Sequence, residues 1–69
     1  MSEHIEMDGV IIDVGRGAFR VECDDSEHVI VARVGGKLRK HKIRIIMGDK
    51  VRVKMSPYDL TNGIIIRRY

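Results

Sequence analysis

The chain has 69 residues, of which 43% are hydrophobic and 33% charged, and its formal net charge is +3. A domain of this length buries only about 60% of the surface of its unfolded chain, so we expect one domain with one small core, too short for a Rossmann domain, a TIM barrel or a kinase fold. A single cysteine excludes a disulfide framework.

The first predicted element is a long strand over residues 5–14. Its apolar residues occupy odd-numbered positions before Gly9 and the even-numbered positions Val10, Ile12 and Val14 after it. A glycine at a change of parity is typical of a bulge or a sharp bend. We therefore expect the strand to be interrupted or bent at Gly9.

Two hairpins are predicted to connect the first three strands. Alternation over residues 18–23 predicts a second strand with Cys23 on its inner, apolar face, and residues 29–34 form a third. The glycine-containing segment 15–17 and the polar segment 24–27 predict the two tight turns between them.

A short helical turn is predicted between the third and fourth strands. The polar segment 35–43 is too long for a tight hairpin. Leu38 is separated from Lys42 and from Ile45 by approximately helical intervals, which indicates one helical turn.

Two more strands complete the set. Residues 50–55 alternate strictly between cations and apolar side chains, which places Val51 and Val53 on the inner face. Residues 56–63 predict a loop, with Asn62 and Gly63 as a pair suited to positive φ, before a fifth strand that ends at Arg68.

Five strands, a bent first strand and an insertion after the third predict an all-β fold. The order of elements fits a five-stranded OB-fold barrel, and an SH3-like barrel is the main alternative. We expect residues 1–69 to form this single domain.

Charge is distributed unevenly along the chain. Residues 1–35 contain three basic and eight acidic side chains, whereas residues 36–69 contain ten basic and two acidic ones. Such segregation favours binding to a polyanion, and a nucleic acid is the expected partner, although a solvated charged surface is the simpler alternative.

Residues for catalysis or metal binding do not assemble in the sequence. Cys23 shares the inner face of its strand with other core positions. We expect it to act as a small hydrophobic side chain and not as a nucleophile with His28 as its base. Asp24 and Asp25 are typical turn residues. The histidines have no zinc-ligand spacing with the cysteine. We expect a protein that is not an enzyme and uses no metal or cofactor.

The candidate binding site is a basic segment between the third and fourth strands. Its cations are Lys37, Arg39, Lys40, Lys42 and Arg44. Leu38, Ile43 and Ile45 lie among them and can anchor the segment to the barrel while the cations face phosphates. Only 4% of the residues are aromatic, so successive bases have few rings to stack on. We expect recognition of folded RNA through phosphates and shape, or of a few unstacked bases.

Several motifs resemble those of the bacterial translation initiation factor 1 family. They are G-K-L-R-K at 36–40, I-R-I at 43–45, G-D-K-V at 48–51 and P-Y-D-L at 57–60. Ile5-Glu6-Met7 and Phe19-Arg20-Val21 also match, and the resemblance extends from Ile5 to Arg68.

The resemblance implies an S1-like, RNA-binding OB domain that binds the small ribosomal subunit at the aminoacyl-tRNA site. Its partners there would be the decoding region of the rRNA, a neighbouring ribosomal protein and the other initiation factors, which it would assist while blocking premature tRNA entry. The free protein is expected to be monomeric.

The resemblance also assigns site residues. Lys37, Arg39, Lys40 and Arg44 occupy the family's basic positions facing rRNA, and Arg67 matches a basic position in the last strand. Arg16 lies in the hairpin loop that the family inserts into the rRNA minor groove. A general RNA-binding OB module, of the cold-shock or RNA-chaperone type, is the alternative function.

The expected location is the cytoplasm, without membrane association. Residues 1–6 lack the basic region and apolar stretch of a signal peptide. The longest apolar run, residues 29–32, is far shorter than the ~20 residues that span a bilayer.

Overall fold

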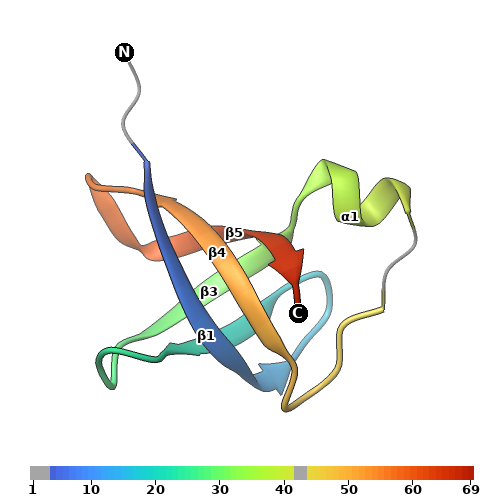
Figure 1. Cartoon of the computed structure of the whole chain (residues 1–69), viewed down its shortest axis with the longest axis horizontal. Helices are drawn as coiled ribbons and strands as arrows, with labels where there is room; N and C mark the ends of the chain where they lie inside the picture. Colours follow the sequence, from blue (N-terminus) through green and yellow to red (C-terminus); the bar gives the residue numbers. More distant parts are fainter. Residues whose placement is uncertain (1–3, 42–43) are drawn as a thin grey trace.

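The computed structural model describes residues 4–41 and 44–69 as a small barrel with one short helix. The elements are β1 (Ile5–Val14), β2 (Phe19–Cys23), β3 (Val29–Val34), α1 (Gly36–Lys40), β4 (Lys50–Ser56) and β5 (Asp59–Arg68). The strands close in the order β1-β2-β3-β5-β4, and every pair is antiparallel except β3 with β5 (Figure 1). The predicted five-stranded OB-fold barrel with a helical turn between the third and fourth strands is confirmed.

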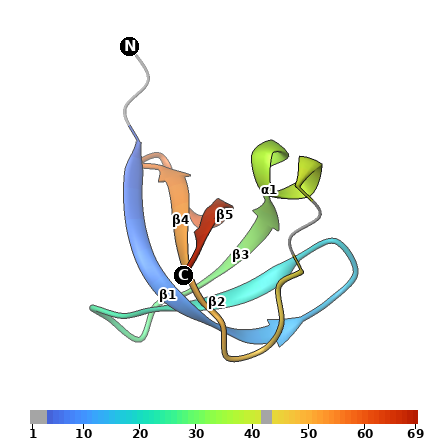
Figure 2. The same ribbon diagram turned by 45° about the vertical axis from the view of Figure 1, so that its right-hand side comes forward.

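Closure of the barrel depends on the length of β1. Residues 5–10 of this strand pair with β4, and residues 9–14 pair with β2. The strand curves strongly along its length to reach both neighbours (Figure 2). One strand thereby supplies backbone partners to two others, and no long edge is left open for a foreign chain.

The predicted change of parity after Gly9 is wrong. Odd-numbered positions stay inward as far as Ile11, which is 1% exposed, whereas Ile12 and Val14 lie on the exposed face. The register shifts between Ile11 and Asp13, so the bulge follows the glycine instead of coinciding with it. Because three consecutive residues at this point are apolar, either face could be the inner one, and alternation alone could not decide.

Gly9 is required by the close approach of two strands. It lies opposite both Cys23 of β2 and Val51 of β4. A Cβ atom at Gly9 would lie 2.5 Å from the carbonyl oxygen of Glu22 and 2.7 Å from Cγ1 of Val21. Only a residue without a side chain fits here.

The core fills the inside of the barrel. The predicted alternation is confirmed in β4, where Val51 and Val53 are fully buried, and Cys23 of β2 is 2% exposed. Burial of each large aliphatic side chain contributes about 1.5–3 kcal/mol to stability. The buried residues are Ile11, Val21, Cys23, Ile30, Ala32, Leu38, Ile45, Val51, Val53, Met55 and Ile65.

The two predicted hairpin turns are present. In the first, the Gly15 N–H donates to the carbonyl oxygen of Ala18 at 2.9 Å, and Gly17 has a φ of 71°. Glycine populates this left-handed region at little cost, which explains its place in the turn. The second turn occupies residues 24–27.

β5 begins earlier than predicted, and the expected loop over residues 56–63 is wrong. The strand starts at Asp59, so only a two-residue turn separates it from β4. Its polar first residues bond to one another, since the Asp59 carboxylate accepts from Thr61 Oγ1 at 2.6 Å and from Asn62 Nδ2 at 3.1 Å. The stretch is extended because it pairs with two strands: Asp59 lies opposite Ser56 of β4, and Asn62 lies opposite Val31 of β3.

The predicted positive φ at Gly63 is also wrong. This glycine lies in the middle of β5 where the strand passes close to the core. A Cβ atom would lie 3.1 Å from Cδ1 of Ile30 and 3.2 Å from the carbonyl oxygen of Lys54. Gly63 therefore serves packing rather than a turn.

α1 is attached to the barrel at both ends. Before it, the Gly35 N–H donates to the carbonyl oxygen of Ile65 at 2.9 Å. Within and after it, Leu38 and Ile45 are each only 7% exposed. These contacts hold the helix beside the end of β5, on the outside of the barrel (Figure 1).

Candidate nucleic-acid interface

Carboxylates of the N-terminal half neutralise part of the basic C-terminal half. Because β1 is paired with β4, acidic and basic side chains that are far apart in sequence meet on the outer face of the sheet. Among the described residues three ion pairs join the two halves, namely Lys50–Asp24, Arg52–Asp8 and Arg52–Glu6, whereas Arg68–Asp49 lies within the C-terminal half. The segregation of charge in the sequence is thus only partly kept in space.

Asp8, Arg52 and Tyr69 form a hydrogen-bonded group on this face. Arg52 Nε donates to Asp8 Oδ1 at 2.8 Å, and the Tyr69 hydroxyl donates to the same oxygen at 3.0 Å. The bond from Arg52 lowers the pKa of Asp8, and the same bond raises the pKa of Arg52. Partial burial raises the pKa of the Tyr69 phenol. Arg52 is therefore engaged by the barrel itself.

Arg67 lies next to this group. It is opposite Arg52 in the β4–β5 ladder, and its guanidinium carbon is 5.3 Å from the centre of the Tyr69 ring. Among the described residues no carboxylate forms an ion pair with it. Arg67 can still bind an external phosphate, but from the end of β5 and not from α1.

The basic segment presents its cations outward, as expected. Arg39, Lys40 and Arg44 are exposed, and none forms an ion pair with a carboxylate in the described part of the chain. The buried side chains of Leu38 and Ile45 anchor the segment between and beside them. The interleaving of anchors and cations seen in the sequence is thus confirmed at these positions.

The structure does not describe every residue of the predicted segment, and the predicted anchor Ile43 lies outside the described residues. The backbone of Lys37 belongs to α1. Lys42 lies outside the described residues.

Arg16 is exposed at the tip of the first hairpin. The hairpin loop, α1 and the segment that leads into β4 lie on the same side of the barrel in both views (Figures 1 and 2). No ion pair with a described carboxylate involves Arg16. The fold therefore brings two predicted contacts, separated by more than twenty residues, to one side of the molecule.

Three further cations have no ion pair with any carboxylate that the structure describes, and none of them is among the site residues predicted from the sequence. They are Arg20, Arg33 and Lys54. Each lies on a strand at a position that alternates with buried residues. The alternation itself was the signal that could have placed them on one outer face.

Cys23 has the environment of a core residue. It is almost fully buried, and this burial raises the pKa of its thiol. A thiol that resists ionisation is a poor nucleophile. Across residues 4–41 and 44–69, no group of three or more His, Cys, Asp or Glu side chains is placed to hold a metal ion. The one helix in these ranges is too short to cross a membrane.

Comparisons with known proteins identify the family and the fold of this chain. A family model described as "Translation initiation factor 1A / IF-1" matches residues 2–69. The solution structure of translation initiation factor 1 from the Wolbachia endosymbiont strain TRS of Brugia malayi is 45% identical to this chain, with a TM-score of 0.77. The match covers 96% of this chain and 78% of that one.

Two larger proteins share the barrel. YjeQ from Thermotoga maritima is 22% identical with a TM-score of 0.78, and the circularly permuted GTPase YloQ is 28% identical with a TM-score of 0.79. Each match covers 94% of this chain but only 23% of the larger one. These likenesses concern one domain of each protein, and the first shows the fold alone.

Proposed function

Because the chain belongs to the translation initiation factor 1A / IF-1 family, we propose that it binds the small ribosomal subunit at the aminoacyl-tRNA site. There it contacts the rRNA of the decoding region and a neighbouring ribosomal protein, assists the other initiation factors and blocks premature entry of tRNA. It acts in the cytoplasm by binding and not by catalysis, as a single RNA-binding domain that is monomeric when free.

The observation that supports this proposal is the set of unneutralised cations on one side of the barrel. Arg39, Lys40 and Arg44 are exposed without carboxylate partners among the described residues, and Arg16 lies on the same side. Arginine and lysine side chains in this state gain most from phosphate because they lose no internal ion pair on binding. Lys37 and Lys42 extend the same segment in sequence.

The rigid attachment of α1 supports the same function. Leu38 is buried against the barrel, so the cations beside it are held in place before RNA arrives. A preformed arrangement loses less conformational entropy on binding than a mobile basic tail does. Arg67 adds a contact from the end of β5, where its stacking on Tyr69 restricts the guanidinium.

A matched pair of lysine variants tests the proposal. Lys40→Gln removes an unpaired cation of α1, whereas Lys50→Gln removes a cation already held by Asp24. Both substitutions change the net charge equally. Binding to purified small subunits is measured by co-sedimentation across a salt series for both variants and the wild type.

We expect saturable one-to-one binding that weakens steeply with salt. Lys40→Gln should reduce the slope of log affinity against log salt by about 0.7–0.9, because one phosphate contact is lost. Lys50→Gln should leave the slope nearly unchanged. Equal effects of the two variants would contradict the assigned contact. Binding of unrelated RNAs as tightly as the small subunit would favour a general RNA-binding module instead.

A further inference from the structure

A second surface of the barrel combines exposed aliphatic side chains with unpaired cations. We call it the β3–β5 face. Its apolar members are Val29, Val31, Leu60 and Ile64, which are 40%, 41%, 45% and 45% exposed. Since β3 and β5 are adjacent parallel strands, these side chains lie in two neighbouring columns on the outside of the sheet, and Asn62 lies between Leu60 and Ile64, opposite Val31.

The strand register places three cations around this apolar centre and one carboxylate, Glu22 of β2, opposite Val29 at one end of it. Arg20 of β2 lies opposite Val31, and Arg33 of β3 lies opposite Ile64, which in turn lies opposite Lys54 of β4. None of these three cations is in an ion pair with a carboxylate of the described residues. With three cations and the single carboxylate of Glu22, the rim of the face has a net positive charge, concentrated at the end that contains Arg33 and Lys54.

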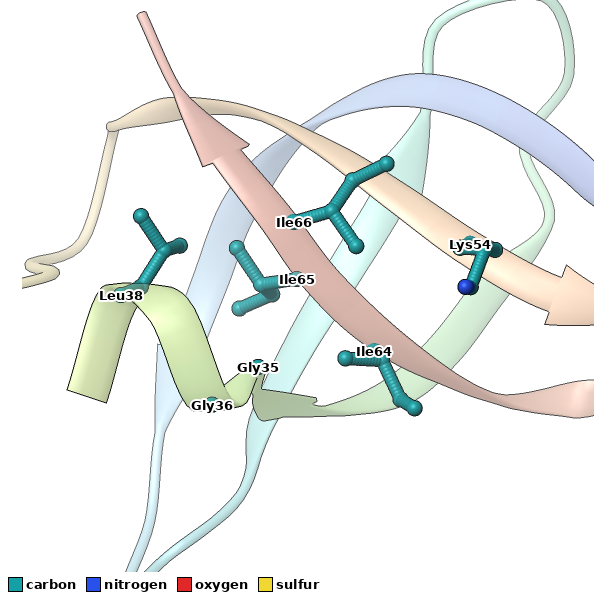
Figure 3. A pocket seen from close by; sticks show the side chains of 7 residues that line it. All are labelled: Gly35, Gly36, Leu38, Lys54, Ile64, Ile65 and Ile66. Atoms are coloured by element: carbon teal, nitrogen blue, oxygen red, sulfur yellow. The ribbon is translucent and has the colours of Figure 1, made fainter. Parts of the chain in front are cut away.

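A hollow of about 240 Å³ adjoins the face between α1 and β5. Its walls include Ile64 and Ile66 of β5, Leu38 of α1 and the side chain of Lys54 (Figure 3). Glycines at the junction of β3 and α1 keep one side of the hollow open. The dimensions and lining suit one apolar side chain with an acidic group beside it.

The chemistry of the face favours protein over RNA. Single-stranded RNA is held on OB barrels by stacking of bases on exposed aromatic rings. Here Phe19 packs against the core, Tyr58 lies in the β4–β5 turn, and Tyr69 is engaged by Asp8. An apolar centre with a charged rim that contains arginine is instead typical of a protein interface.

We infer that the β3–β5 face binds a protein whose contact surface has an apolar centre and an acidic rim. The closed barrel offers no free edge here, so the partner docks by side chains and does not add a strand. The inference rests on the proposed function, because we expect the partner to be one of the proteins of the initiation complex. It concerns a surface distinct from the cations of α1.

Site-directed cross-linking tests the inference. A photoreactive phenylalanine analogue replaces Val31 in one version of the chain and Val14, exposed on β1 outside the face, in a control version. Each is mixed with purified small subunits, messenger RNA, initiator tRNA and the other initiation factors, and in parallel with those factors alone. Adducts are digested with protease or ribonuclease and identified by mass spectrometry.

We expect a protein adduct from position 31 at an acidic-rimmed site on its partner, in higher yield than from position 14. The double change Arg33→Glu and Lys54→Glu should lower this yield roughly fivefold or more, because the complementary charge is reversed. The cross-linking yield is normalised to the amount of the same variant that co-sediments with bare subunits, because the loss of four units of positive charge also weakens electrostatic binding. Its melting temperature should remain as in the parent chain. Circular dichroism establishes that the variant is folded.

Three results would overturn the inference: an adduct to RNA, a yield from position 31 no higher than from position 14, or a yield that charge reversal does not change. The proposed function is judged separately. It fails if the wild-type chain does not co-sediment with small subunits, whichever adduct forms with the factors alone.

Discussion

The packing at Gly9 makes a prediction whose size follows from the structure. In Gly9→Ala the new Cβ would lie 2.5 Å from the Glu22 carbonyl oxygen and 2.7 Å from Val21 Cγ1. The first of these atoms is backbone in the adjacent strand, so it cannot rotate away. β1 and β2 must separate where β1 also pairs with β4.

Gly15→Ala is the matched control for this substitution. Its Cβ would meet only the Ala18 carbonyl oxygen, at an ordinary 3.5 Å, and Gly15 does not have a positive φ. Alanine reduces the entropy of the unfolded chain at both positions, which stabilises by about 0.4–1 kcal/mol. At Gly9 the overpacking cost of about 1–3 kcal/mol opposes this gain.

Because the entropy gain is common to both variants, we expect Gly9→Ala to be less stable than Gly15→Ala by the overpacking cost of about 1–3 kcal/mol. In a domain of this size each kcal/mol corresponds to about 4–8 °C in melting temperature. Urea and thermal unfolding followed by circular dichroism measure the difference. Equal stabilities of the two variants would refute the close approach of β1 and β2 at this residue.

Three further substitutions test the core, the ion pairs and the hairpin contact. Val53→Ala should cost about 2–3 kcal/mol and Val14→Ala no more than about 0.5 in urea unfolding, because only the first side chain is fully buried; similar losses would indicate a wrong strand register. The bond from Arg52 depresses the pKa of Asp8 in the folded state, so its contribution to stability is present at neutral pH and is lost as pH falls through that lowered pKa. Wild type should thus lose more stability than Asp8→Asn in urea titrations below about pH 4, and parallel curves would contradict this. Arg16→Ala should weaken subunit binding by about 1 kcal/mol or more without a change in melting temperature; unchanged affinity and rRNA footprint would exclude this contact.

Strand positions with strict alternation were predictable from the sequence. β3 and β4 begin at the expected residues, and Val53 faces inward as expected. The helical turn was also predictable, because a polar segment interrupted by Leu38 needs a local structure that buries one side chain. In both cases a pattern of neighbours within a few residues is enough to select the local conformation.

The boundary of β5 was not predictable in the same way. A polar run with an Asn-Gly pair has the composition of a loop, and its pairing with Val31 of β3 and Ser56 of β4 cannot be read from composition. Gly63 was expected to allow a turn, yet it is present because Ile30 packs against it from another strand. The role of a glycine depends on neighbours that are distant in sequence.

The basic segment, including Arg39, Lys40 and Arg44, was identified as the candidate RNA-binding site from the sequence alone, because its cations lie within eight residues of one another. Which other cations remain available for a partner was decided only by the tertiary structure. Lys50 is bound to Asp24, whereas Lys54 on the same strand has no carboxylate partner among the described residues. The physical reason is that an ion pair depends on the distance between two charged atoms, and here strand pairing and barrel closure set that distance.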